Sequence, residues 1–83
     1  MTKYRIGYLS DGFSNGDLRD FLPVYFTAYD KNRFSVYGYH TGRVDEVTAM
    51  FREAADGWHD MEGRTAAEIA GAIRADGIDI LVQ

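Results

Sequence analysis

Hydrophobic and polar residues alternate in two segments of the first half of the chain, which is the pattern of half-buried β-strands. Residues 4–10 read YRIGYLS and run into the turn-forming stretch SDGFSNG. Residues 34–39 read FSVYGY, in which every second side chain would face the same side of a sheet. The pattern therefore predicts strands at 4–10 and 34–39.

Other segments carry apolar residues at intervals of three and four, the pattern of amphipathic helices. The first of these spans 17–29, where Pro23 lacks a backbone donor and is expected to kink the helix. The second begins after Asp45, which can cap its start, and ends before Gly57. The residues expected on the inner face of this second helix are Val47, Met50, Phe51 and Ala54.

A third helix has the clearest boundaries in the sequence. Thr65 and Glu68 form a capping box at its start, and Gly77 is expected to end it. Its inner face is predicted to carry Ala66, Ile69, Ala70 and Ile73.

Two more strands complete the pattern. Residues 58–61 are expected to form a short, weak strand, and residues 78–82 read IDILV, an aliphatic run typical of a parallel strand covered on both faces. The alternation of strands and helices predicts a Rossmann-like, doubly wound α/β fold with a parallel sheet of four strands. We expect the order 3-2-1-4, with three right-handed crossover helices, and a single domain over residues 1–83, because this length allows one modest core.

Composition narrows the possible partners and compartments. The formal net charge is -4, and no stretch gathers Lys and Arg into a stripe, so we expect no nucleic-acid partner. There are no cysteines, which excludes disulfides and thiolate metal sites and fits a cytoplasmic location. No apolar run is long enough to span a membrane. We expect no metal, no cofactor and no catalytic residue in this chain on its own.

The loop after the first strand is the candidate site, since ligands of such sheets bind beyond the carboxyl ends of the strands. Its glycines allow close approach of the backbone, and the following helix start offers free N–H groups. Its spacing, however, is not a phosphate-binding motif, and its acidic residues oppose a phosphate, so turn formation and helix capping are the expected roles. The residues of this loop are Ser10, Asp11, Gly12, Phe13, Ser14, Asn15 and Gly16.

Other polar residues give weaker signals. We expect His40 to be an exposed loop residue and His59 to be a side chain of an edge strand. Asp11 and Asp60, each after a strand, faintly resemble the carboxylates of a phosphoacceptor receiver domain, but the fifth strand and lysine of that fold are missing. Trp58 and the tyrosines are expected to supply core area rather than a sugar-stacking surface.

Three stretches give the chain a recognisable likeness. RIGYLSDGFSNGDLRDFL, AYDKNRFSVYGYHTG and ADGIDILV together resemble bacterial O-linked N-acetylglucosamine transferases of the SPINDLY type. The resemblance implies a parent enzyme with tetratricopeptide repeats and two Rossmann-like lobes in the GT-B arrangement. Such an enzyme transfers N-acetylglucosamine from a UDP-sugar to Ser or Thr hydroxyls. This chain would be the start of the N-terminal lobe, inactive alone, with the remaining lobe, the repeats and the acceptor protein as its partners.

The same likeness draws attention to Gly16. Members of the family commonly carry Asp-Phe-x-Asn-His after the first strand, and Gly16 stands where the resemblance implies a histidine at the catalytic cleft. Either the parent does without the imidazole or it is a divergent relative. The alternative function is a non-catalytic protein-interaction domain of the same fold. We also expect weak self-association through the strand at 78–82, whose outer edge would have no partner.

Overall fold

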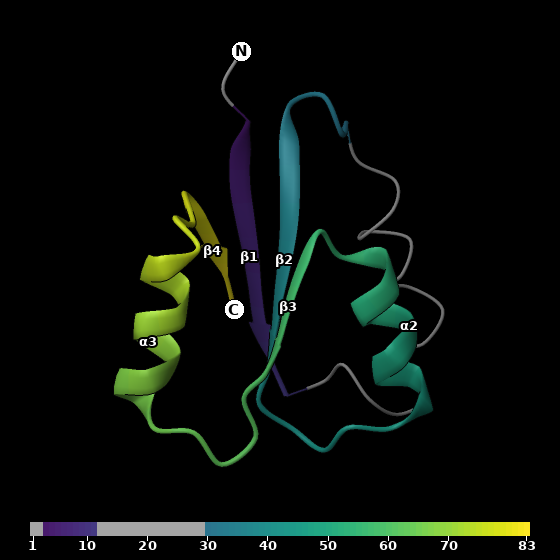
Figure 1. Ribbon diagram of the computed structural model, residues 1–83, viewed down its shortest axis with the longest axis vertical. Helices are drawn as coiled ribbons and strands as arrows, with labels where there is room; N and C mark the ends of the chain where they lie inside the picture. Colours follow the sequence, from purple (N-terminus) through teal and green to yellow (C-terminus); the bar gives the residue numbers. More distant parts are fainter. Residues whose placement is uncertain (1–2, 12–29) are drawn as a thin grey trace.

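The computed structural model describes residues 3–11 and 30–83, which form a parallel sheet with helices on both of its faces (Figure 1). The sheet has four strands in the order β3-β2-β1-β4. The strands are β1 (Tyr4–Ser10), β2 (Phe34–His40), β3 (Gly57–Asp60) and β4 (Ile80–Val82). The predicted α/β fold and strand order are confirmed. The helix predicted at 17–29 lies outside the described residues.

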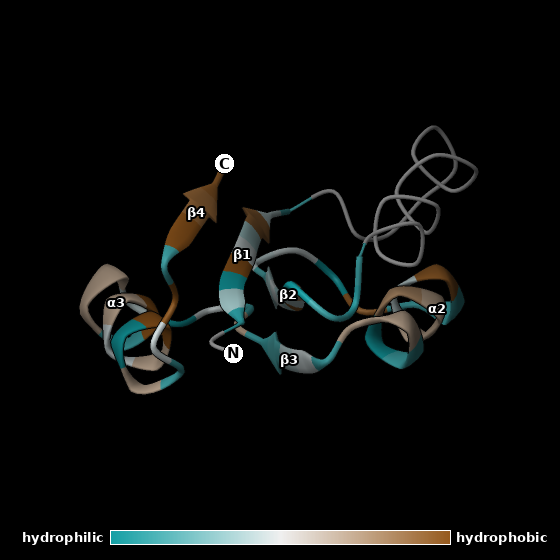
Figure 2. Cartoon of the chain, turned by 90° about the horizontal axis from the view of Figure 1, so that it is seen from above, coloured by the Kyte–Doolittle hydropathy of each residue, from teal (hydrophilic) through white to brown (hydrophobic). Residues whose placement is uncertain are grey.

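Two helices, α2 (Glu46–Ala54) and α3 (Ala66–Ala75), lie on opposite faces of the sheet (Figure 2). Both begin as the sequence predicts, because Asp45 and Thr65 each accept hydrogen bonds from backbone N–H groups of the first turn. Gly77 follows the end of α3 with a φ of 65°, a conformation that glycine adopts at little cost. The connections therefore follow the doubly wound pattern in the described part of the chain.

The core lies between the sheet and α2. Val36, Val47 and Phe51 form its buried centre. Tyr8, Ala54, Ala55 and Trp58 pack around this centre. Met50, predicted on the inner face of α2, is 46% exposed, so that prediction was wrong. The buried residues of α2 are Val47, Thr48 and Phe51, and the polar Thr48 can be buried because its hydroxyl is hydrogen-bonded to Asp45.

The side of the molecule formed by α3 and β4 is much more open. No residue of α3 is buried, although Ile69, Ala70 and Ile73 are partly covered and Ala66 is exposed. Strand β4 begins at Ile80 rather than at residue 78, and its three residues are exposed. The expectation of a strand covered on both faces was therefore wrong for this chain. Within the described ranges, no helix is long and apolar enough to cross a membrane.

Candidate functional site

The ends of the three strands β1, β2 and β3 meet at the carboxyl edge of the sheet. Ser10 pairs with His40, and His40 pairs with Asp60, so the last residues of the strands lie side by side in one row. The candidate loop starts from this row, at Ser10 and Asp11. Ser10 is partly buried and Asp11 is exposed, whereas residues 12–16 of the loop lie outside the described residues.

Backbone contacts join the loops that leave this edge. The N–H of Thr41 donates to the carbonyl of Ser10 over 3.0 Å, and the N–H of Met61 donates to the carbonyl of His40 over 2.7 Å. Gly42 lies so close to the loop after β1 that a Cβ on Gly42 would be 2.5 Å from the carbonyl oxygen of Asp11. Only glycine fits this approach, and the loops after β1 and β2 are therefore in direct contact.

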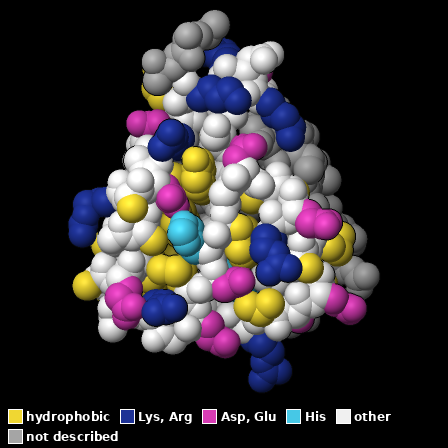
Figure 3. Space-filling model, viewed as in Figure 1, with side chains coloured by type: hydrophobic (Ala, Val, Ile, Leu, Met, Phe, Trp, Pro, Cys, Tyr) yellow, Lys and Arg dark blue, Asp and Glu magenta, His cyan; other side chains and the backbone are white. Residues whose placement is uncertain are grey.

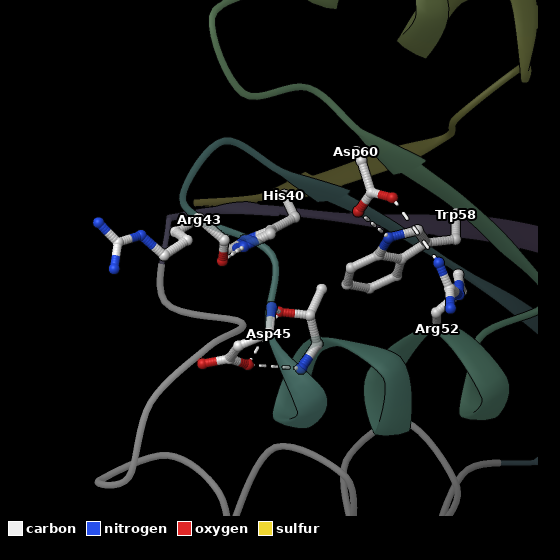
Figure 4. A network of polar contacts seen from close by, with 7 residues as sticks. His40, Arg43, Asp45, Arg52, Trp58 and Asp60 are labelled. Carbon is white, nitrogen blue, oxygen red and sulfur yellow. Dashed lines mark hydrogen bonds and ion pairs between the residues drawn. The ribbon is translucent and has the colours of Figure 1, made fainter.

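His40 is fully buried at the end of β2, which corrects the expectation of an exposed loop residue. Its Nε2 atom lies 2.7 Å from the carbonyl oxygen of Arg43 (Figure 4). A carbonyl only accepts hydrogen bonds, so Nε2 carries the proton and donates. The side chain of His40 thus closes the turn that follows β2, because it bonds to a residue three positions further along the chain.

Asp60, at the end of β3, is occupied by two structural contacts. One carboxylate oxygen accepts from the indole N–H of Trp58 over 2.7 Å, and the other lies 3.9 Å from the guanidinium of Arg52 (Figure 4). Strand β2 separates it from Asp11. Among residues 3–11 and 30–83, no group of three or more His, Asp or Glu side chains could hold a metal ion. The faint likeness to a receiver domain gains no support here.

A second polar cluster lies on the face of the sheet that carries α3. The hydroxyl of Tyr39 donates to Asp76 over 2.6 Å, and Nε2 of His59 lies 2.8 Å from the same carboxylate oxygen. The rings of Tyr39 and His59 stack with their centroids 5.3 Å apart. Burial, followed by the hydrogen bond to Asp76, raises the pKa of Tyr39, so its hydroxyl stays protonated.

The exposed member of this cluster is His59, whose side chain is 39% accessible. Figure 3 shows a histidine at the surface of this face, bordered by hydrophobic and acidic side chains. The expectation that His59 is a side chain of an edge strand is confirmed, because β3 is at one edge of the four-stranded sheet. The cluster ties the end of α3 to the sheet.

Sequence reasoning found the start of the candidate loop but missed the turn beside it. Thr41 and Gly42 contact Ser10 and Asp11, and these contacts follow from parallel strands that end in the same row. That topological rule could have indicated them. Nothing in the sequence indicated the cluster of Tyr39, His59 and Asp76, whose members are far apart along the chain.

These features define the class as a Rossmann-like parallel α/β domain whose connecting loops gather at the carboxyl edge of the sheet. No family model matches the chain, and no curated protein matches it. Among solved structures, the chain is similar to the K341M mutant of Thermobaculum terrenum O-GlcNAc transferase, with 36% sequence identity and a TM-score of 0.87. The match covers 95% of this chain but only 15% of the transferase chain.

Proposed function

We propose that this chain is the first part of the N-terminal catalytic lobe of a protein O-GlcNAc transferase-like enzyme of the SPINDLY type. The parent would transfer N-acetylglucosamine from a UDP-sugar to Ser or Thr hydroxyls. Residues 1–83 would form a single α/β domain within it, and tetratricopeptide repeats would precede it. The chain by itself would be inactive, because the resemblance assigns the nucleotide contacts to the other lobe.

One observation carries this proposal. The chain matches a segment of an O-GlcNAc transferase in both sequence and structure over 95% of its own length. The arrangement of the carboxyl edge agrees with it, because the loops after β1 and β2 contact each other where sheets of this class bind their ligands. Asp11 leaves this edge as an exposed residue at the start of the loop assigned to the cleft.

Gly16 favours a second candidate, a non-catalytic interaction domain. An imidazole at this position could orient or relay a proton at the acceptor hydroxyl, and glycine has no group that can do so. A domain that had lost the transfer reaction would be free to keep the fold and dock a partner protein.

The sequence that flanks this segment in its gene separates the two candidates. A reading frame with repeats upstream and a second Rossmann-like lobe downstream supports the transferase, whereas a stop codon directly after the codon of Gln83 supports the interaction domain. A titration of the 83-residue chain with UDP-N-acetylglucosamine, followed by NMR, tests the assignment of the nucleotide site. We expect no saturable shifts. Shifts that saturate at submillimolar ligand around Ser10 and Asp11 would contradict the proposal.

A further inference from the structure

The turn after β2 is held from inside the molecule by a buried histidine. His40 is fully buried, and a polar ring in that position is costly unless it is hydrogen-bonded. Its Nε2 donates to the carbonyl of Arg43 over 2.7 Å, across a turn of three residues. This bond fixes the path of the backbone between the end of β2 and the approach to α2.

The same turn, residues 41–43, is in close contact with Ser10 and Asp11 at the start of the candidate loop. A Cβ on Gly42 would lie 2.5 Å from the carbonyl oxygen of Asp11 and 3.1 Å from Cε1 of His40, so Gly42 lies between the two. The N–H of Thr41 donates to the carbonyl of Ser10. A displacement of the turn would therefore be transmitted to the backbone of Ser10 and Asp11.

The histidine is itself held from the side of β3. Its carbonyl accepts the N–H of Met61 over 2.7 Å. Its ring lies 6.3 Å from the ring of Trp58, which in turn donates to Asp60 (Figure 4). His40 thus connects the loops that leave β1, β2 and β3 at one edge of the sheet.

We propose that His40 is a positioning residue for the carboxyl edge: it holds the turn 41–43 in place, and the turn in turn fixes the backbone of Ser10 and Asp11. It acts through Gly42 and Thr41 and does not contact the reacting atoms. This inference rests on the proposed function for its catalytic consequence, whereas the positioning itself can be measured in the 83-residue chain.

Two substitutions of His40 separate positioning from simple stability. His40→Gln keeps an N–H donor at the place of Nε2, and His40→Met has a similar length without a donor. Phe51→Leu serves as a control that weakens the core away from the turn. For each variant, unfolding by urea gives the stability, and amide exchange and chemical shifts report on Ser10, Asp11 and Thr41.

We expect His40→Met to speed exchange of the Thr41 amide by roughly fivefold to tenfold, about the effect of losing one hydrogen bond. The amide shifts of Ser10 and Asp11 should move with it. His40→Gln should restore both readouts, and Phe51→Leu should leave them close to those of the unchanged chain. Unchanged Thr41 exchange in His40→Met, or no restoration by His40→Gln, would overturn the inference.

The catalytic consequence is measured in a hybrid of the Thermobaculum terrenum enzyme in which this chain replaces the matched segment. There, His40→Met should lower kcat with little change in the KM for the UDP-sugar, and His40→Gln should restore kcat. Equal losses for both variants would count against positioning. A hybrid that folds but is inactive with every residue at position 40, even when position 16 is histidine, would contradict the proposed function, while the exchange data would still decide the role of His40.

Discussion

At the scale of single residues, β2 and β3 are held together by two glycines that each pack against an aromatic ring of the other strand. A Cβ on Gly38 would lie 2.2 Å from Cζ3 of Trp58, and a Cβ on Gly57 would lie 2.4 Å from the ring of Tyr37. The two pairs are neighbours in the register and lie on opposite faces of the sheet, because successive residues of a strand alternate. Each ring covers the backbone of the glycine beside it.

Gly38→Ala should therefore destabilise the chain by about 1–3 kcal/mol, because the added methyl displaces a ring that packs on the core. Gly71→Ala is the matched control, since nothing lies within 4 Å of the added Cβ in helix α3. That change should raise stability by about 0.5–1 kcal/mol. Urea unfolding measures both, and a neutral Gly38→Ala would contradict the described packing of Trp58.

A second prediction at the residue scale concerns the contribution of the Tyr39 hydroxyl to the stability of the fold. Near neutral pH, Tyr39→Phe should cost about 1 kcal/mol, because Asp76 loses a donor. The raised pKa of Tyr39 means that the folded state keeps its proton at a pH where the unfolded state has lost it. This contribution to stability is complete below about pH 10 and declines as the pH rises further.

The free energies of unfolding of the unchanged chain and of Tyr39→Phe should therefore converge in alkaline solution. Urea titrations of both proteins at about pH 8 and about pH 11 give the comparison. The other tyrosines titrate in both proteins and cancel in the difference. A constant difference between the two pH values would argue against a protonated, hydrogen-bonded hydroxyl at Tyr39.

The histidines show why single residues are difficult to place from sequence. The expectation for His59 was correct because strand position alone determines it. His40 was predicted to be exposed, since a polar residue at the end of a strand usually meets solvent. The carbonyl of Arg43 makes its burial possible, and that partner depends on the shape of the turn.

At the scale of elements, the described helices were predicted well because the hydrogen bonds that define their first residues are formed between near neighbours in the sequence. The side chains of Asp45 and Thr65 contact backbone within the next three residues, so the sequence contains all that defines each cap. Strand β4 was predicted less well. Its first two expected residues belong to the connection between α3 and β4, where Asp79 exchanges hydrogen bonds with the backbone of Arg5.

We propose that β4 is also where the isolated chain associates with itself. Ile80, Leu81 and Val82 are 49%, 40% and 40% exposed, and within the described ranges β4 pairs with β1 alone. An uncharged aliphatic edge of this kind recruits another strand. Sedimentation at increasing concentration should show reversible association, and Leu81→Lys should weaken it. A strict monomer at millimolar concentration would contradict this proposal.

At the scale of the whole molecule, the topology could be predicted because few arrangements satisfy an alternation of strands and helices. The strand order agrees with the expected 3-2-1-4, although the apolar strand β4 lies at an edge of the sheet and is exposed. The topology places the loops after β1 and β2 side by side, but the details of their contacts could not be predicted in the same way. They depend on how closely Gly42 approaches Asp11 and on the burial of His40, and both are set by packing between distant segments.

The central claim is that these residues are a working part of an O-GlcNAc transferase-like lobe, and the hybrid enzyme tests it most directly. Transfer of N-acetylglucosamine from UDP-N-acetylglucosamine to an acceptor protein is measured for the hybrid and for its Gly16→His variant, with the Thermobaculum terrenum enzyme as reference. We predict that both hybrids fold and that Gly16→His transfers the sugar faster, because it supplies the missing imidazole. Folded hybrids without transfer activity, even with histidine at position 16, would contradict the account.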